Sequence, residues 1–323
     1  MLLFSSKKPV ELQITHLNKV QKKQRQEFEQ VVTADDCGGC LSKLLSLAKS
    51  NAKEKGQDKT TNKQDDAKTI YVLDFDGDIK ASAVSQLREE ISAIISVAKA
   101  NDEVVIRLES GGGQVHAYGL AAEQLQRIKE AQLSLTVCVD KIAASGGYMM
   151  ACVADKIIGA SFSIVGSIGV VSQMPNFYDF LKKYDINIES FTAGEYKRTV
   201  TMFDKNDDKD REKYQSELER IHWLFKNHVA SHRPRLDIEK VATGEFWFGK
   251  DAHILGLIDE LGTSDAYILG LMDNHNVFAL NLRTKPNLLE KLGLDEQIGV
   301  SITDFVGKAG LRAAEFLAKI NRP

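Results

Sequence analysis

The sequence predicts an α/β fold in which short parallel strands alternate with helices. Three runs rich in β-branched residues, Ile70–Phe75, Val104–Leu108 and Leu133–Val139, have the length and composition of buried strands. The segments between them carry apolar residues at helical spacing. A helix between two successive strands allows them to pair in parallel through a right-handed crossover, so we expect a parallel sheet covered by helices.

The composition restricts the kinds of partner that the chain can have. With 323 residues and a net charge of -3, the chain is long enough for a large core and has no global attraction for nucleic acid. No apolar run reaches the roughly 18 residues that a membrane span needs. Met1–Lys8 has its charge on the wrong side of a short apolar stretch for a secretory signal.

We expect three regions, namely a basic helical N-terminal region with a polar linker over 1–68, a folded domain over 69–282 and a helical tail over 283–323. Pro9–Gln30 has the pattern of a basic amphipathic helix, which is either a solvated helix or one that contacts a membrane surface or a partner. Leu41–Ala48 has a second, shorter helical pattern, and Asn51–Lys68 is polar enough to be a flexible linker. Ile302–Ile320 predicts a final amphipathic helix that contacts either another copy or the membrane.

The four cysteines do not form a disulfide framework. Cys138 and Cys152 lie in apolar patterns, so we expect buried thiols. Cys37 and Cys40 form a C-x-x-C pair outside any strand–helix–strand context. A surface thiol pair or loop is the favoured interpretation there, with a redox site or half of a metal site as the alternative.

Within the folded domain the sequence predicts a definite order of helices and strands. After the first strand we expect a helix over Leu87–Ala98, and after the second a helix over Ala117–Ile128. The elements expected after the third strand are a helix over Met149–Ala154, strands over Ile157–Ile158 and Ile164–Val171, a helix over Phe177–Tyr184, a strand over Ile186–Phe191 and a helix over Arg211–Ser231.

Ser145 lies at the junction between a strand and a helix, directly before Gly146 and Gly147. The two glycines allow a sharp turn and leave the first N–H groups of the helix without partners. A nucleophilic serine needs this geometry. The alternative is a helix N-cap that has no chemical role.

Gly111–Gly113 follows another strand at its carboxyl end, where sites collect in parallel sheets. The loop lacks the Lys-Ser/Thr of a phosphate-binding loop and the spacing of a dinucleotide fold. It is therefore either a plain turn or a loop whose N–H groups face a developing oxyanion.

Four motifs together resemble the signal peptide peptidase A family of serine peptidases. They are Glu109–Gly113, Asp140–Tyr148, Ile164–Val170 and Thr192–Arg198, and the resemblance extends from about Ile70 to Leu271. It implies a ClpP/crotonase-like fold of stacked ββα units and a Ser-Lys dyad that needs no metal or cofactor. The 69–282 region would then be the peptidase domain.

The resemblance assigns a role to each matching residue. It implies that Ser145 is the nucleophile, Lys197 the general base and Ser167 the hydroxyl that orients the lysine, and that the N–H groups of Gly112 and Gly146 form the oxyanion hole. Gly111 stands where the family usually has proline. Because proline restricts the unfolded chain, we expect a more flexible loop here.

A lysine acts as a base only in its neutral form. The pKa of Lys197 would have to fall by about 2–3 units from its reference value of about 10.4, which burial can provide. Lys141 and Lys156 lie beside Asp140 and Asp155, which we expect to hold them charged. Lys197 taken alone would be read as a surface cation, and His116 as an ordinary helix residue.

The resemblance also implies partners and a location. The dyad is completed between repeats or protomers in the related peptidases, so we expect a homo-oligomeric ring that binds hydrophobic peptides such as signal-peptide remnants. The expected location is the bacterial inner membrane on its periplasmic side, although no anchor is visible in the sequence. The rival hypotheses are an acyl-CoA enzyme of the crotonase fold and a catalytically silent membrane scaffold.

Overall fold

The computed structural model describes residues 10–34 and 68–284. These residues belong to two compact units, one formed by residues 14–281 and the other by residues 1–13 with 282–323. The second unit is described only at Val10–Gln13 and Leu282–Thr284, the outer ends of two strands. The larger unit contains every predicted site residue.

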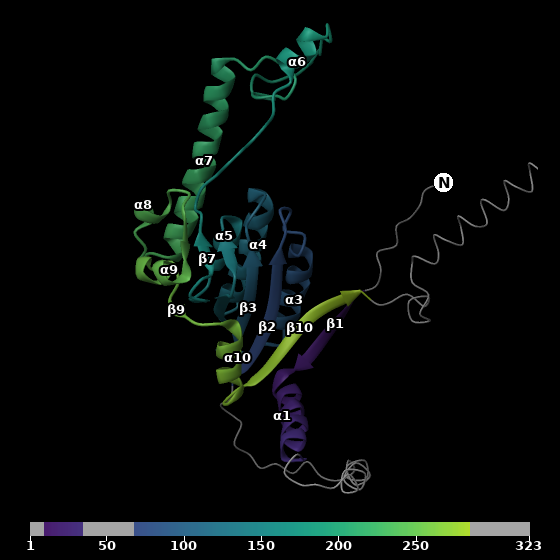
Figure 1. Ribbon diagram of the computed structural model, residues 1–323, viewed down its shortest axis with the longest axis vertical. Helices are drawn as coiled ribbons and strands as arrows, with labels where there is room; N and C mark the ends of the chain where they lie inside the picture. The colour runs from purple at the N-terminus through teal and green to yellow at the C-terminus, as the bar shows by residue number, and fades with distance from the viewer. Residues whose placement is uncertain (1–9, 35–67, 285–323) are drawn as a thin grey trace, which may run out of the picture. The chain divides into compact units, whose positions relative to one another are not determined.

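A parallel sheet forms the centre of the larger unit (Figure 1). Its strands follow the spatial order β10, β2, β3, β4, β6, β9, and each pairs with its neighbour in parallel. Their bounds are β2 (Thr69–Gly77), β3 (Glu103–Ser110), β4 (Ser134–Val139), β6 (Lys156–Gly159), β9 (Glu260–Leu261) and β10 (Asn276–Thr284). The α/β class predicted from the alternating pattern is confirmed.

Three short strands branch from the carboxyl end of β3. They are β5 (Ile142–Ala144), β7 (Ile164–Gly166) and β8 (Phe246–Phe248). The last residue of β3, Ser110, pairs with Ala143 of β5, which then pairs in parallel with β7, and β7 pairs antiparallel with β8. This branch brings the glycine loop after β3 next to the strand that precedes Ser145.

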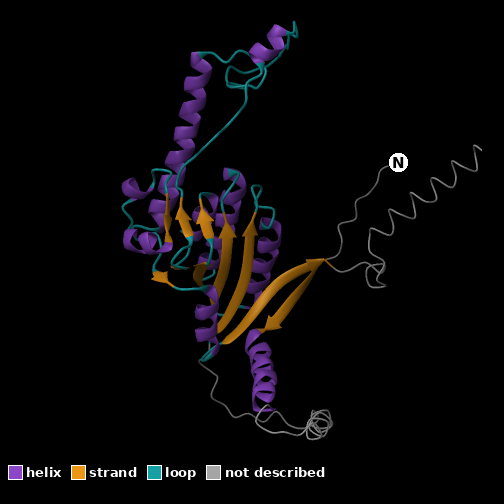
Figure 2. Ribbon diagram, viewed as in Figure 1, coloured by secondary structure: helices purple, strands orange, loops and turns teal. Residues whose placement is uncertain are grey.

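Helices pack on both faces of the sheet, as Figure 2 shows. On one side lie α3 (Val84–Val97), α4 (Val115–Glu130) and α5 (Gly146–Ala151), and their apolar faces are buried. On the other side α10 (Ser264–Met272) packs its Ile268 against Val72, Val105 and Cys138 of the strands. Because both faces are covered, the strands are buried apolar runs, as expected for a parallel sheet.

Beyond β7 the chain forms an arm, residues 170–207, which extends away from the sheet and returns along a long helix (Figure 1). The arm contains the short helix α6 (Tyr178–Lys183). The long helix α7 (Asp208–His232) begins with a capping box between Asp207 and Asp210. Two further short helices, α8 (Ile238–Val241) and α9 (Gly249–Leu255), lie between α7 and β9.

The N-terminal segment differs from the prediction of a single helix over Pro9–Gln30. It forms a strand, β1 (Val10–His16), followed by a helix, α1 (Leu17–Ala34). A four-residue spacing such as Val10 to Ile14 fits both a strand and a helix, so the apolar pattern did not distinguish them. The boundary is fixed by Asn18, whose amide donates to the carbonyls of Met272 and His275 and accepts from the N–H of Val277.

Three other predictions in the domain are wrong in part. Ile186–Phe191 is not a strand, because an alternating pattern still needs a neighbouring strand and the arm offers none. The strand β7 ends at Gly166, where the backbone turns to φ 98°. The helix after Ser145 begins at once, at Gly146, and ends at Ala151.

The remaining elements of the domain form close to where the sequence placed them, and Cys138 and Cys152 are both buried free thiols, as predicted. The predicted helices over Leu41–Ala48 and Ile302–Ile320, nearly all of the polar linker, and the Cys37–Cys40 pair lie outside the described residues. No helix in the described ranges has both the length and the apolar character of a membrane span.

An ion pair between Arg233 and Asp259 joins the end of α7 to the start of β9 and yields a stability prediction. The guanidinium donates to both carboxylate oxygens, at 2.7 and 2.9 Å, and Asp259 also accepts from the N–H of Ile157 at 2.7 Å. Burial raises the pKa of Asp259, but the hydrogen bonds from Arg233 and Ile157 lower that pKa by more, so it lies below its ordinary value. The charged carboxylate is therefore the form that stabilises the fold.

We expect Asp259→Asn to lower the free energy of unfolding at neutral pH by about 1–3 kcal/mol, because it leaves a partly buried guanidinium poorly paired. The loss should shrink as the pH falls below the unfolded value of about 3.9, where the wild-type carboxylate is also protonated. Urea titrations at several pH values measure this. The exposed Glu89→Gln is the control, and an Asp259→Asn deficit that does not change with pH would contradict the assignment.

Candidate active site

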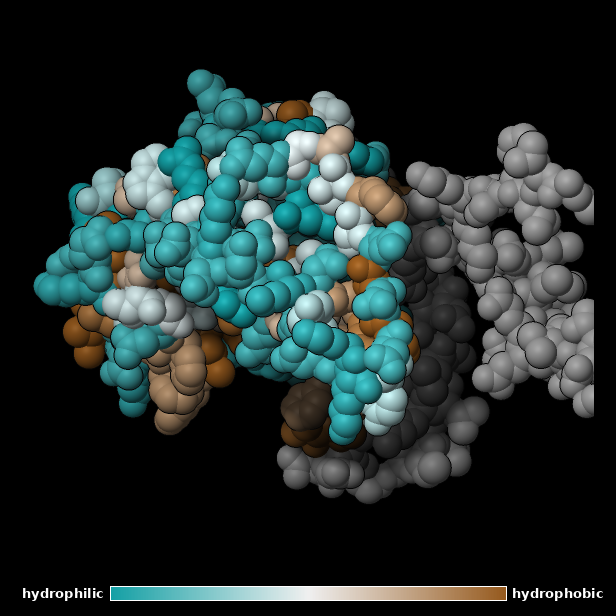
Figure 3. All heavy atoms as spheres, turned by 90° about the horizontal axis from the view of Figure 1, so that it is seen from above, coloured by the Kyte–Doolittle hydropathy of each residue, from teal (hydrophilic) through white to brown (hydrophobic). Residues whose placement is uncertain are grey.

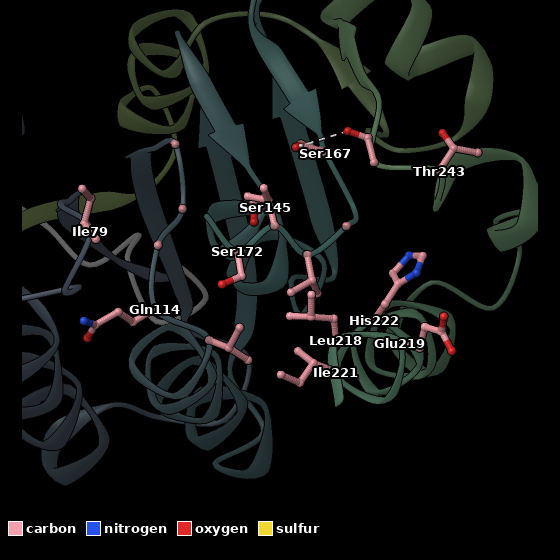
Figure 4. A pocket seen from close by; sticks show the side chains of 18 of the residues that line it. Ile79, Gln114, Ser145, Ser167, Ser172, Leu218, Glu219, Ile221, His222 and Thr243 are labelled. Carbon is pink, nitrogen blue, oxygen red and sulfur yellow. Dashed lines mark hydrogen bonds between the residues drawn. The ribbon is translucent and has the colours of Figure 1, made fainter. Parts of the chain in front are cut away.

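Ser145, the predicted nucleophile, lines a cleft of about 980 Å³ between the glycine loop and α7 (Figure 4). A cleft of this volume is within the range of small-molecule and peptide sites. Ser145 and Ser167 both line this cleft, at the ends of two adjacent strands. The full lining is Ile79, Gly111–Val115, Ser145, Ser167, Gly169–Ser172, Tyr214, Gln215, Leu218, Glu219, Ile221, His222, Thr243 and Gly244.

Ser145 has the backbone conformation of a nucleophile at a sharp strand-to-helix turn. Its φ is 51° and its ψ is -118°, a region that costs a side-chain-bearing residue about 1–3 kcal/mol. The turn is held by a 2.8 Å hydrogen bond from the Ser145 N–H to the Gly166 carbonyl, and by the Met149 N–H, which donates to the Ser145 carbonyl. Ser145 occupies the N-cap position of α5, but its side chain makes no capping hydrogen bond to the helix.

Ser167 lies beside Ser145 because of strand register. Ala144 of β5 pairs with Gly166 of β7, so the two serines are the next residues on two paired parallel strands. Ser167 has the same φ of 51°, and its N–H donates to the Glu245 carbonyl at 2.7 Å. Its hydroxyl is 3.5 Å from the Gly244 carbonyl, at the outer limit of a hydrogen bond, and remains free to bind another group.

The backbones of Gly112 and Gly146 lie so close together that a side chain on Gly112 would not fit. A Cβ on Gly112 would lie 2.6 Å from the nitrogen of Gly146, and Gly112 has a φ of 88°. The Gly146 N–H, first in α5, has no acceptor in residues 10–34 or 68–284. The Gly112 N–H instead donates to the hydroxyl of Ser110 at 3.1 Å. Of the two predicted oxyanion donors, the Gly146 N–H is thus free to bind an acceptor, whereas the Gly112 N–H is already hydrogen-bonded within the loop.

Tyr118 and Ser110 form a buried pair beneath the glycine loop. Their hydroxyl oxygens are 2.6 Å apart, and the Tyr118 hydroxyl donates to the Asp78 carbonyl at 2.7 Å. The Tyr118 ring also lies directly against Gly146, where a Cβ would come within 2.4 Å of the ring. One tyrosine side chain therefore packs against the turn at Ser145 and holds the hydroxyl that binds the Gly112 N–H.

His222 contributes the opposite wall of the cleft from α7 (Figure 4). Its Nε2 lies 3.2 Å from the Ile168 carbonyl and 3.0 Å from the Ala242 carbonyl. Since both partners are acceptors, Nε2 carries the proton. The imidazole therefore tethers the segment after Ser167 to α7 and is not placed as a base for Ser145.

Lys197 is not brought to Ser145 within the chain. It lies in the arm, is exposed, and is absent from the lining of the cleft. Its neighbours are engaged elsewhere, since Glu195 pairs with Lys209 at 3.1 Å and the Tyr196 ring lies under Lys213. In the described residues Lys197 has no ion-pair partner that would keep it in this position.

The lysines closer to Ser145 in sequence are engaged in ion pairs. Lys141 pairs with both oxygens of Glu109 at 3.0 and 2.9 Å, and this hydrogen bond and charge raise its pKa. Lys156 pairs with Glu260 at 2.7 Å. The expectation that Asp140 and Asp155 hold these lysines is wrong: the partners are Glu109 and Glu260, while Asp140 accepts from Ser264 and Asp155 pairs with Lys129. His116 is exposed on α4.

Three residues that shape this site were not predicted from the sequence: Ser110, Tyr118 and His222. Ser110 belongs to one of the four motifs but had no role there, and Tyr118 is one apolar-face residue of a helix. Apart from Gly112, which is two residues from Ser110, the partners cited here lie 8 to 54 residues away along the chain, and no local signal reports such contacts. A polar residue at the end of a buried strand was the available hint for Ser110.

Comparisons with known proteins agree with this geometry. Residues 127–278 match the family described as Peptidase family S49, and residues 4–125 match Peptidase family S49 N-terminal. Two relatives described as probable protease SohB, from Haemophilus influenzae and Buchnera aphidicola, are 57% and 52% identical to this chain over 224 residues. The chain therefore belongs to peptidase family S49.

The matched stretch covers only part of each relative. It is 69% of this chain and 64% and 67% of the Haemophilus and Buchnera proteins. A putative protease of Methanocaldococcus jannaschii is 32% identical over 208 residues, or 63% of this chain and 64% of that protein. The similarity to the SohB proteases is thus the stronger one, over about two thirds of their length.

The contact between Gly112 and Gly146 yields a prediction with a matched control. Gly112→Ala should slow labelling of Ser145 by a fluorophosphonate by about 10²–10³ if the glycine loop binds an oxyanion, because the new Cβ displaces that loop. Gly111→Ala should label within about threefold of wild type, since its Cβ meets only Ile142 at 3.8 Å. Circular dichroism checks that both variants fold. Equal labelling of the two folded variants would show that the close approach is unimportant.

Tyr118→Phe tests the buried hydroxyl pair. The substitution keeps the ring against Gly146 but leaves the Asp78 carbonyl and the Ser110 hydroxyl with one partner fewer, so the free energy of unfolding should fall by about 1–3 kcal/mol. Urea denaturation measures the loss. Tyr184→Phe, an exposed tyrosine of the arm, should change stability by less than about 0.5 kcal/mol. A Tyr118→Phe variant as stable as that control would refute a structural role for the hydroxyl.

Proposed function

We propose that this protein is a serine endopeptidase that hydrolyses peptides through an acyl-enzyme, with Ser145 as nucleophile and Lys197 as general base. The observation that carries the proposal is the strained turn at Ser145. There the Ser145 hydroxyl makes no capping hydrogen bond, and the adjacent N–H of Gly146 has no acceptor among the described residues. A serine turned in this way, at the start of a helix in a cleft, is typical of acyl transfer. Membership of peptidase family S49 supports the same reaction.

The proposed reaction needs a proton carrier and an oxyanion site. Neutral Lys197 takes the proton of the Ser145 hydroxyl as its oxygen attacks the peptide carbonyl, and then gives that proton to the leaving amine. Water then attacks the ester carbonyl, Lys197 takes a proton from that water, and the proton returns to Ser145 as the acid leaves. Ser167, next to Ser145 and with a weakly engaged hydroxyl, would orient the lysine amine.

The oxyanion would be bound by Gly146 and Gly112. The Gly146 N–H is available as it stands, whereas the Gly112 N–H must rotate from the Ser110 hydroxyl toward the cleft. A glycine peptide can make this rotation at small cost because it has no Cβ. Substrate binding would thus complete the oxyanion site.

We infer that Lys197 reaches Ser145 from a neighbouring copy of the chain. The arm that carries Lys197 exposes many large apolar side chains to solvent, and apolar patches interrupt the polar face seen from the end of the arm (Figure 3). They include Phe180, Tyr184, Ile186, Ile188, Phe191 and Tyr196. An exposed apolar surface of this kind is typical of an interface, and burial there would favour the uncharged amine that a base requires.

Such contacts, repeated head to tail, would close a homo-oligomeric ring with a ClpP/crotonase-like subunit. The cleft would then bind extended peptides with hydrophobic side chains, since Ile79, Val115 and Val171 line it and are 72%, 41% and 83% exposed. Signal-peptide remnants and fragments of membrane or envelope proteins fit this description. No cofactor or metal takes part in the proposed reaction.

We place the protein at the bacterial inner membrane, facing the periplasm. The helix α1 supports a membrane-surface contact, because Phe28, Val31 and Val32 in its second half are 71%, 64% and 55% exposed and its first half carries three lysines. An amphipathic basic helix with an exposed apolar side binds anionic lipid surfaces.

A mixing experiment tests the dyad and its location together. Ser145→Ala and Lys197→Ala should each abolish cleavage of a fluorogenic hydrophobic peptide. Mixing the two variants during assembly should restore about a quarter of wild-type activity if the base comes from a neighbour, because one site in four then pairs an intact serine with an intact lysine. Lys205→Ala, another lysine of the exposed arm segment, is the control and should remain active.

Each other outcome has a definite meaning. No recovery on mixing, with both variants assembled, would place the dyad within one chain. Full peptide cleavage by Ser145→Ala would refute the serine mechanism. A wild-type protein that assembles but neither cleaves peptides nor reacts with a fluorophosphonate would be a silent scaffold.

A further inference from the structure

A second cluster of reactive side chains lies at the opposite end of α5 from Ser145. The thiol of Cys152 and the imidazoles of His228 and His232 each offer one ligand atom, and these three atoms lie within 4.8 Å of one another. Cys152 directly follows α5 and is fully buried, whereas the two histidines lie one turn apart on α7 and are half-buried. Nothing in the proposed peptidase reaction uses these residues.

Hydrogen bonds to backbone carbonyls hold both imidazoles in place. His228 Nε2 lies 2.9 Å from the Met149 carbonyl, and His232 Nδ1 lies 2.8 Å from the His228 carbonyl. His232 Nε2 has a further acceptor, the side-chain oxygen of Gln126, at 3.3 Å. Because all of these oxygens accept, a bound cation would replace one of these contacts on each ring.

The two imidazoles lie side by side, with ring centroids 4.5 Å apart. The adjacent thiol of Cys152 can supply a negative charge once a cation displaces its proton.

We propose that Cys152, His228 and His232 form a structural site for Zn²⁺. One thiolate and two imidazoles are a ligand set that zinc prefers, and the ligand atoms need to approach by only about 1 Å to reach the spacing of a tetrahedral site with bonds of about 2.0–2.3 Å. Gln126, whose side-chain oxygen is 3.3 Å from His232 Nε2, or a water would complete the coordination. A soft monovalent cation such as Cu⁺ is the competing occupant of such a set.

Zinc at this position would fasten the helix after Ser145 to α7. The Met149 carbonyl, which accepts from His228 and from the Cys152 thiol, belongs to the same helix whose first turn is bonded to Ser145. The site is therefore structural, and Zn²⁺ binding does not depend on whether Ser145 cleaves peptides. The sequence does contain a hint, an H-x-x-x-H pair on one helix face, but the cysteine lies far away in the chain.

The experiment uses the untagged full chain with Cys37→Ser and Cys40→Ser, which removes a competing thiol pair outside the described residues. Equilibrium dialysis should find one tightly bound Zn²⁺ per chain, and Co²⁺ should give a thiolate-to-cobalt charge-transfer band. In this background, Cys152→Ser, His228→Gln and His232→Gln should each weaken Zn²⁺ binding by more than about 100-fold, and Gln126→Ala by about 10-fold or less. Cys138→Ser, which removes the other buried thiol, should leave binding unchanged.

The site would be overturned if the folded background protein took up no Zn²⁺, or if Zn²⁺ binding survived Cys152→Ser. A cobalt complex without the charge-transfer band would likewise reject the cysteine ligand. If a ligand variant does not fold, the cobalt spectrum of the background protein decides the question. Cu⁺ binding without Zn²⁺ binding would reject the zinc assignment.

Discussion

The parallel pairing of β5 with β7 is the constraint on which the candidate site depends. Their register sets Ala144 opposite Gly166, so the chain leaves the two strands at the same level and turns at Ser145 and at Ser167 side by side. The bond from the Ser145 N–H to the Gly166 carbonyl extends this pairing by one residue. A shift of one residue in either strand would turn one serine to the opposite face.

The glycine loop depends on a second constraint, the absence of side chains where two backbones meet. A Cβ on Gly112 would collide with the backbone of Gly146, and a Cβ on Gly146 would collide with the Tyr118 ring. A single buried hydroxyl pair, between Ser110 and Tyr118, then joins the end of β3 to α4. The strain at Ser145 persists because these surrounding contacts are well packed.

The arm contrasts with this rigid centre. Its interactions are mostly local, such as the stacking of Phe177 on Phe203 and the bonds from Ser190 and Thr201 to Asp204. It exposes an apolar surface that a lone chain leaves in water, and it carries the lysine that the proposed reaction requires. The centre of the molecule therefore positions the proposed nucleophile, while the proposed base is on a part whose apolar surface is suited to a partner.

The sequence by itself determined the α/β class, the family and the turn at Ser145, because apolar periodicity and glycine position are local properties of the chain. Most helix and strand positions from Ile70 to Val139 and the buried thiols were predictable for the same reason. Only the tertiary structure decided that Val10–His16 is a strand, that Ile186–Phe191 is not, and that Ser110, Tyr118 and His222 shape the site. These depend on partners distant in sequence, and a strand or a buried hydroxyl is stable only when such a partner is present.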